Sequence, residues 1–438
     1  MLSAAEDIMS KQSDNTDSTT VSPIVTRSYL TTTINHNTDF LKTTLNYDKY
    51  SIFKDSGNTS DVCLSDISNK QCEKTSTAPV LLADILPALV VKLIFPYFVH
   101  RIPYGVRNAL ICIFQVLAYI TVAFSTNVPI AILGVVFAAI GSGWGEITYL
   151  SLSSNYHPDA ILAWSSGTGA AGLIGSFAYA ALTEPNWADI SPKNTCLIML
   201  IVPIVFAFAY WFLLKKDDKI QRAVLWNITT WIIKKETHVD IEDNHFKHNN
   251  DINVSKHYDL TMKESFKIII SMIKYMIPLG SVYFFEYLIN QGLTSLIVFD
   301  CASGFSLSQA SQYRWFQDVY QVGVFISRSS IKCFRMPYPL LWFLSAFQFA
   351  MLSLFILESM FSFIPHISIV FILILLEGLI GGAAYVNTFD QIHRTTKEEE
   401  KEFALSVATQ GDCIGITLSG FIAIPIHNVI CDFSLRRK

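Results

Sequence analysis

Ten long apolar segments, separated by short polar connections, dominate the hydrophobic pattern of the chain. A transmembrane helix needs about 20 mostly apolar residues to cross the hydrocarbon core of a bilayer. The segments lack the apolar and polar alternation of membrane β-strands, so we expect helices. The predicted spans are residues 80–99, 108–125, 129–152, 163–183, 195–214, 268–298, 311–332, 339–358, 366–388 and 403–426. The predicted fold class is therefore an all-α polytopic membrane protein with ten spans.

Two polar segments flank and divide the apolar part of the chain: one precedes it, and the other separates its two halves. Residues 1–79 and 215–263 each hold 17 of the 68 charged side chains, which together are 16% of the chain. A typical soluble protein has about 25% charged residues. With a net charge of −4, this composition excludes a soluble enzyme and a basic nucleic-acid binder. We predict a lumenal arm, a transmembrane half, a disordered cytosolic loop, a second transmembrane half and a short lumenal tail, at residues 1–79, 80–214, 215–263, 264–430 and 431–438.

Basic residues in the connections predict the orientation of the spans. The connections His100–Arg107, Lys332–Arg335 and Arg394–Lys401 lie on the same side as the basic loop 215–263. Lys and Arg are enriched on the cytosolic side of membrane proteins. This side is therefore predicted to be cytosolic, although Lys193 falls on the opposite side.

The lumenal arm contains a predicted modification site. Asn58 begins an acceptor sequon for N-glycosylation, which functions only in the secretory lumen. Cys63 and Cys72 lie in the same arm and form either a disulfide or two free thiols. The other six cysteines lie in or near spans, and we expect them to be small apolar packing residues.

Charged residues inside the first spans are candidates for function, because each costs about 2.5–3.5 kcal/mol at the centre of a membrane helix. Asp84 and Lys92 share one span but lie about 12 Å apart along its axis. Both are candidates for substrate or proton binding, and Lys92 alternatively extends to the cytosolic surface. Glu146 follows a glycine-rich stretch that permits close approach of a helix or a ligand, and it is a further candidate.

A polar face is predicted in the span 268–298. Tyr283, Glu286 and Asn290 follow i, i+3, i+7 spacing, and Gln291 lies beside them. A carboxylate among a phenol and two amides suits a cationic or proton-coupled ligand. The alternative is a cluster of hydrogen bonds between helices.

The later spans contain three further candidates. Arg328 lies near the cytosolic end of its span, where it either binds an anionic group or anchors the helix at the interface. Glu377 and Asn387 form a polar line on another helix. Arg314 and Asp318 are i, i+4 neighbours, and we expect them to neutralise each other.

Small residues recur every four positions in two spans, an arrangement that permits close helix contact. We expect both lines to lie at helix interfaces. They are Gly167, Ala171 and Gly175, and Gly411, Gly415 and Ser419.

Catalytic and cofactor motifs are missing from the sequence. It has no Walker A loop, no HExxH pair and no GxSxG nucleophile elbow. The His residues at 238, 245 and 248 lie in the predicted cytosolic loop, where we expect solvation and not metal binding. We therefore expect no enzyme activity, no metal and no other cofactor.

Several stretches of the spans resemble the battenin family. The resemblance extends through both halves and is weaker in the arm and the loop. The stretches are VLLADILPALVVKL (80–93), GEITYLSL (145–152), WSSGTGAAGLIGS (164–176), YFFEYLINQGL (283–293), QYRWFQDVYQVGVFISRSS (312–330) and EGLIGGAAYVNTF (377–389).

This resemblance implies properties that the composition does not. It implies a fold like that of the major facilitator superfamily with eleven spans, so the first span of the family is expected to be missing here. It implies residence in late endosomes and lysosomes, and a link to lysosomal pH, to basic amino acids and to glycerophosphodiesters. Glu286 and Arg328 stand in the best-matched motifs and are carried over as site residues. Cys431 resembles the start of the family's prenylation box, but four residues follow that box, so no prenylation is expected.

Two functions are compatible with these features. The first is a lysosomal solute transporter that alternates access between its halves, with a small solute, protons and membrane lipids as partners. The alternative is a membrane scaffold that binds trafficking or pump proteins through residues 215–263. Many charged side chains within the spans favour the transporter.

Overall fold

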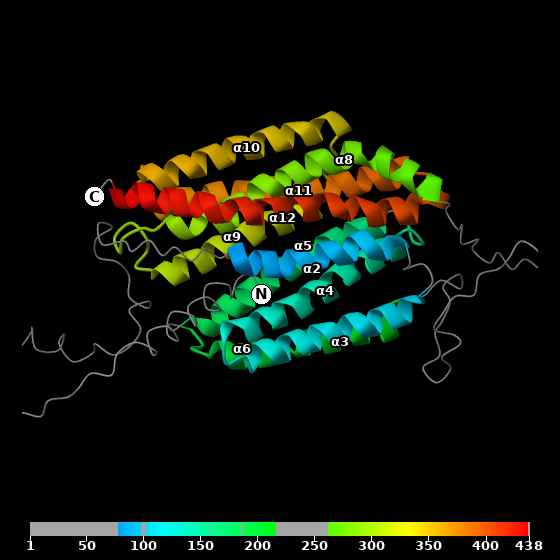
Figure 1. The fold of residues 1–438 in the computed structure, drawn as a ribbon, viewed down its shortest axis with the longest axis horizontal. Coiled ribbons are helices and arrows are strands. Elements are labelled where there is room, and N and C mark those ends of the chain that lie inside the picture. The colour runs from blue at the N-terminus through cyan, green and yellow to red at the C-terminus, as the bar shows by residue number, and fades with distance from the viewer. Residues whose placement is uncertain (1–77, 98–101, 158, 185–186, 216–261, 437–438) are drawn as a thin grey trace, which may run out of the picture.

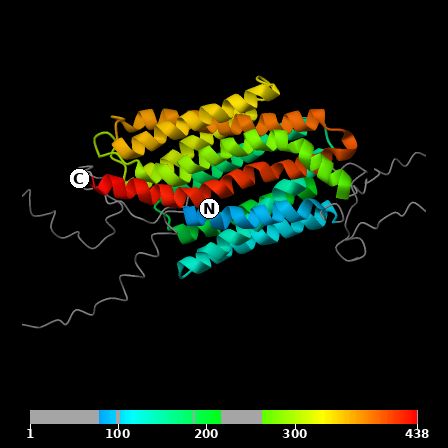
Figure 2. The same ribbon diagram turned by 45° about the horizontal axis from the view of Figure 1, so that its top comes forward.

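The computed structural model describes residues 78–97, 102–157, 159–184, 187–215 and 262–436. Within them, long helices run roughly along one common axis (Figures 1 and 2). Each predicted span coincides with one helix or a short series of helices. Asn58, Cys63, Cys72 and nearly all of the loop 215–263 lie outside the described residues.

The first half of the bundle contains five spans. Its elements are α2 (Ala78–Ile94), η4 (Phe95–Tyr97), α3 (Tyr104–Ala123), α4 (Val128–Ser153), α5 (Asp159–Thr183), α6 (Pro192–Ile198), α7 (Ile201–Phe208) and the π-helical turn η6 (Ala209–Leu213). The second half consists of α8 (Met262–Leu288), the π-helical turn η9 (Ile289–Leu293), η10 (Thr294–Leu296), α9 (Gln309–Ser329), α10 (Tyr338–Phe361), α11 (Ile367–Thr395) and α12 (Glu398–Arg436).

Eight helical segments in the described part of the chain are long and apolar enough to span a membrane. The remaining two of the ten predicted spans correspond to α5 and α9. They have 25 and 21 residues, long enough to cross, but carry more small and polar side chains. These two helices pack against each other between the halves, so their polar faces contact protein.

The outer surface of the bundle is apolar. Large side chains such as Ile204 and Phe212 are 66% and 76% exposed, which is costly in water but favourable against lipid. This surface agrees with the polytopic membrane fold expected from the sequence.

The two halves meet along two principal pairs of helices. Besides α5 and α9, α2 lies beside α12 in both views (Figures 1 and 2). A hydrogen bond from Gln410 Nε2 of α12 to the backbone oxygen of Lys92 of α2, at 3.0 Å, strengthens this second contact. Residues of both helices thus face the interface between the halves.

Only one of the two predicted lines of small residues lies at a helix contact. Gly411 and Gly415 of α12 touch the backbone of Met276 and Gly280 of α8, so no side chain fits between these helices. In contrast, a Cβ atom at Gly167 or Gly175 would meet no atom within 4 Å. That part of the prediction is wrong, because the face of α5 that packs on α9 carries Gly169 and Gly172.

Two of the six cysteines expected to serve only in packing have another role. Cys301 and Cys431 are both disulfide-bonded, whereas Cys112, Cys196, Cys333 and Cys413 are free. Cys301 follows η10, and Cys431 lies near the end of α12, both on the predicted lumenal side. Disulfides are typical of such an oxidising compartment.

Candidate functional site

A buried ion pair joins two of the three candidates of the first half. Lys92 Nζ of α2 lies 2.6 Å from Glu146 Oε2 of α4, and Lys92 is only 2% exposed. The same ammonium group lies 3.7 Å from Asp412 Oδ2 of α12 and donates to the backbone oxygen of Thr409 at 3.3 Å. Lys92 therefore does not extend to the membrane surface. It places one positive charge between two carboxylates at the interface of the halves.

The glycine-rich stretch of α4 explains how Glu146 reaches Lys92. A Cβ atom at Gly143 would lie 3.0 Å from the Cα atom of Ala88 on α2. The absence of a side chain lets the two helix backbones approach closely. Asp84, two turns before Lys92 on α2, is half-buried and makes no ion pair with Lys92.

Tyr385 of α11 connects this pair to the second half. Its hydroxyl donates a hydrogen bond of 2.8 Å to Glu146 Oε1. The guanidinium carbon of Arg328 lies 4.1 Å from the centre of its ring, within the range of a cation–π interaction. One buried tyrosine thus contacts an acidic side chain of the first half and a basic side chain of the second.

Arg328 of α9 is held by both halves. Its Nη1 donates to Thr168 Oγ1 of α5 at 2.9 Å, and its Nη2 donates to the hydroxyl of Tyr283 of α8 at 2.9 Å. The side chain therefore points into the bundle and does not anchor α9 at the membrane surface. Within the described residues, Arg328 Nε has no hydrogen-bond acceptor and is available to an anionic ligand.

These contacts form one continuous polar group, which we call the inter-half site. It links α2, α4 and α5 of the first half to α8, α9, α11 and α12 of the second. Its members are Lys92, Glu146, Thr168, Tyr283, Arg328, Tyr385 and Asp412.

Glu286, Asn290, Gln291 and Glu377 form a separate polar group inside the second half. Tyr320 of α9 donates a hydrogen bond to Glu286 Oε1. Asn290 Nδ2 donates to Glu377 Oε1 of α11 at 3.1 Å, and Gln291 Oε1 accepts from Tyr313 at 3.3 Å. The π-helical turn η9 contains both amides, and such turns are frequent at functional sites. The polar face predicted on this span therefore points to α9 and α11.

Asn387 lies away from both groups. Its Oδ1 accepts a hydrogen bond of 2.8 Å from the backbone nitrogen of Met336, and its Nδ2 donates to the backbone oxygen of Ala383 at 2.9 Å. Asn387 thus attaches the segment after α9 to α11. These hydrogen bonds indicate a structural role for Asn387.

Three members of the two groups were not among the residues singled out from the sequence. Thr168, Tyr320 and Tyr385 are neutral residues in apolar or glycine-rich surroundings, and their spacing gives no signal. Asp412 is a charged residue within the predicted span 403–426, which is a signal for function, but only the structure places it next to Lys92.

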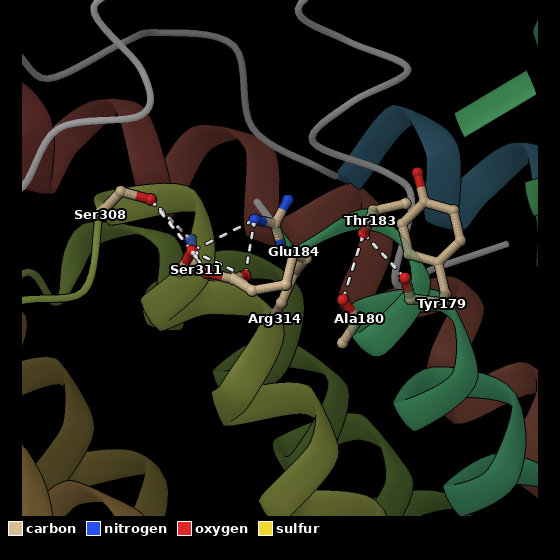
Figure 3. A network of polar contacts seen from close by, with 7 residues as sticks. All are labelled: Tyr179, Ala180, Thr183, Glu184, Ser308, Ser311 and Arg314. Atoms are coloured by element: carbon tan, nitrogen blue, oxygen red, sulfur yellow. Dashed lines mark hydrogen bonds and ion pairs between the residues drawn. The ribbon is translucent and has the colours of Figure 1, made fainter. Parts of the chain in front are cut away.

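A second ionic contact joins the halves at the predicted lumenal end (Figure 3). Arg314 Nη2 of α9 lies 3.3 Å from Glu184 Oε2, directly after α5, and donates to Ser311 Oγ at 3.2 Å. Ser311 Oγ in turn donates to Glu184 at 3.1 Å, while Ser308 caps α9 through the backbone nitrogen of Ser311. The observed ion pair of Arg314 is thus with Glu184, and not with the predicted partner Asp318.

Polar contacts also join the halves at the predicted cytosolic end. Ser166 of α5 and Ser329 of α9 are hydrogen-bonded at 2.8 Å between their hydroxyls. Ser151 of α4 donates a hydrogen bond to Glu402 of α12. The inter-half site therefore lies between contacts at both ends of the bundle.

The described residues contain no group of three or more His, Cys, Asp or Glu side chains placed to hold a metal.

Comparisons with known proteins agree on one family. The CLN3 protein family model matches residues 1–433. Battenin of Canis lupus familiaris is 41% identical over 367 residues, covering 84% of this chain and 80% of battenin. Protein BTN1 of Yarrowia lipolytica is 35% identical over 365 residues, with 83% and 88% covered, and protein btn1 of Schizosaccharomyces pombe is 34% identical over 365 residues, with 83% and 87% covered.

One similar solved structure is that of a bacterial homologue of the iron transporter ferroportin in the outward-facing state. It has a TM-score of 0.45 and 15% sequence identity, and the similarity covers 82% of this chain and 89% of that chain.

Proposed function

The chain belongs to the CLN3/battenin family of multi-pass membrane proteins, and from this premise we propose that it is a solute transporter of the lysosomal and late endosomal membrane. The observation that carries the proposal is the inter-half site. A continuous polar group between two helical halves is what alternating access needs, because a solute bound there contacts both halves.

The charges of the site favour a solute that carries both a negative and a positive charge. Arg328 offers Nε to an anionic group, and the site also contains the carboxylates of Glu146 and Asp412. The ring of Tyr283 lies 6.4 Å from that of Tyr385, centre to centre, so a second aromatic ring is next to the one that contacts the guanidinium. A bound quaternary ammonium group would be stabilised by such aromatic faces.

We therefore propose glycerophosphodiesters as the substrate class, with glycerophosphocholine as the test solute. Its phosphate would bind Arg328, and its ammonium group would lie against the tyrosines. Arginine is the less favourable candidate, because its guanidinium would face Arg328 and Lys92. Removal of such solutes from the lumen would contribute to lysosomal homeostasis.

The test is uptake of labelled glycerophosphocholine and arginine by liposomes that contain the purified full chain. We expect saturable uptake of glycerophosphocholine that Arg328→Lys strongly reduces, because lysine loses the planar set of donors. Arg335→Lys is the matched control, because Arg335 is exposed outside the site.

Two other outcomes of the uptake test would reject part or all of the proposal. Faster uptake of arginine than of glycerophosphocholine would reject the proposed substrate class but keep the transporter. Absence of uptake of both solutes by folded protein would reject the transporter. It would favour a scaffold that acts through residues 215–263, which deletion of residues 220–260 would then test.

A further inference from the structure

Two buried carboxylates in the second half each have an oxygen without a partner. Glu286 and Glu377 are 1% and 0% exposed. The Oε1 atom of Glu286 accepts from Tyr320, and that of Glu377 accepts from Asn290. Within the described residues, the Oε2 atom of each has no hydrogen-bond partner. The Oδ1 atom of Asn290 likewise has none.

The helix geometry places these two carboxylates on adjacent turns of the bundle. Glu286 lies against Gly381 of α11, where a Cβ atom would overlap its carboxylate. Gly381 is four residues after Glu377, and Asn290 is four residues after Glu286, so each step is about one helical turn. Because Asn290 bonds to Glu377, the two carboxylates are about one turn apart along α8 and α11.

No ion pair within the described residues neutralises either carboxylate, although the positive charge of Arg328 acts on Glu286 from a distance. Lys92 is paired with Glu146, and Arg328 is bonded to Tyr283 and Thr168. The titratable and charged side chains near the pair are Tyr320 and Arg328 of α9, Tyr283 and Tyr287 of α8, Asp84 of α2, and Asp412 and His427 of α12. Glu358 of α10 is directed elsewhere and accepts from the backbone nitrogens of Phe363 and Ile364.

Two adjacent buried carboxylates do not both ionise readily, because burial and mutual repulsion disfavour the second charge. A proton bound to one Oε2 atom removes one charge and creates an O–H donor. The unpartnered Asn290 Oδ1 and the second carboxylate supply acceptors for that donor.

We propose that Glu286 and Glu377 form a proton-binding pair that couples solute movement to the proton gradient. The inference rests on the transport function proposed above but assigns the proton to a site separate from the inter-half site. The proton binds a carboxylate oxygen from acidic lumenal water and later leaves to cytosolic water, with no other bond broken. Tyr283, which accepts a hydrogen bond from Arg328, is three residues before Glu286 on the same face of α8.

The test separates solute exchange from proton-driven accumulation in liposomes containing the full chain. Exchange of labelled for unlabelled glycerophosphocholine at equal pH needs no coupling proton. We expect Glu286→Gln and Glu377→Gln to keep this exchange, whereas accumulation driven by a pH gradient falls to an inside-to-outside ratio of one. Glu399→Gln, at the exposed start of α12, is the matched control and should accumulate like the unchanged protein.

Gly381→Ala is a second variant that perturbs the carboxylate of Glu286, without replacing Glu286 itself. The added methyl group would displace the side chain of Glu286, and we expect the same loss of accumulation with exchange retained. Thermal unfolding of each purified variant shows which of them are folded.

Four results would overturn the inference. They are gradient-driven accumulation in both Gln variants, loss of exchange in folded forms of both, dependence on sodium ions at a fixed pH gradient, and failure of a pH gradient to drive accumulation by unchanged protein that does exchange the solute. Absence of exchange in the unchanged protein is a different result, because it rejects the transport function itself.

Discussion

The hydroxyl of Tyr385 lies 2.8 Å from Glu146 Oε1 and forms a direct hydrogen bond between the two halves of the bundle. Tyr385→Phe removes this bond but keeps the ring beside Arg328. A hydrogen bond to a charged group contributes about 1.5–3 kcal/mol, so we expect solute uptake to fall by about tenfold or more. Tyr338→Phe is the control, because it removes a hydroxyl that donates to the backbone oxygen of Lys274, outside the inter-half site. Equal uptake by the two variants would contradict a role of the hydroxyl in transport.

The buried ion pair between Lys92 and Glu146 predicts a non-additive effect on stability. Removal of one partner leaves an uncompensated buried charge, a loss of about 3–5 kcal/mol. We expect Lys92→Met to lower the unfolding temperature of the purified protein strongly. The double variant with Glu146→Gln should recover part of the loss, because fewer unpaired charges remain. If the two single effects simply add, the pair does not act as one unit.

The contact between Glu184 and Arg314 predicts a charge-swap rescue at the predicted lumenal end. Glu184→Arg places two positive charges together and should separate α5 from α9. The reciprocal change Arg314→Glu restores an attractive pair, and we expect it to recover uptake in the double variant. Uptake should be compared with that of each single variant. A double variant as impaired as the worse single variant would exclude a pairwise interaction.

The close contact between α8 and α12 predicts different tolerance at two glycines. Gly415→Ala would place a methyl group against the backbone of Gly280, and such overpacking costs about 1–3 kcal/mol. Gly175→Ala meets no atom within 4 Å and should leave stability nearly unchanged. Thermal unfolding of the two purified variants measures the difference. Equal stability of the two variants would show that Gly415 does not lie at a close contact between α8 and α12.

The state of the cysteines predicts their labelling by maleimides. Cys333 is free, exposed and on the predicted cytosolic side, so an impermeant reagent should modify it in intact organelles. Cys301 and Cys431 should react only after reduction and permeabilisation, because both are disulfide-bonded. Cys333→Ser removes the early label and serves as the control. Reaction of Cys301 from the cytosolic side without reduction would reverse the predicted orientation.

The sequence resemblance to the battenin family is confirmed by the family match over residues 1–433. The ten predicted spans also coincide with helices in the described residues. The spans are predicted for a local reason, because a run of apolar residues long enough to cross a bilayer forms a helix wherever its neighbours lie.

The partners of the polar side chains could not be predicted in this way. Lys92 and Asp412 are 320 residues apart, and the fold alone brings the ends of their side chains to 3.7 Å. The i, i+4 spacing suggested Asp318 as a partner for Arg314, but the structure pairs it with Glu184 of the other half. Sequence spacing describes neighbours on one helix, whereas a buried charge is stabilised by whichever helix packs against it.

The sequence by itself therefore determined the membrane class, the spans and the family. It also identified the charged residues within the predicted spans, since hydropathy and insertion energy depend on local composition. Only the tertiary structure decided that Tyr385 links Glu146 to Arg328 and that Gly381 leaves space for Glu286, because both relationships arise from the packing of helices distant in the chain.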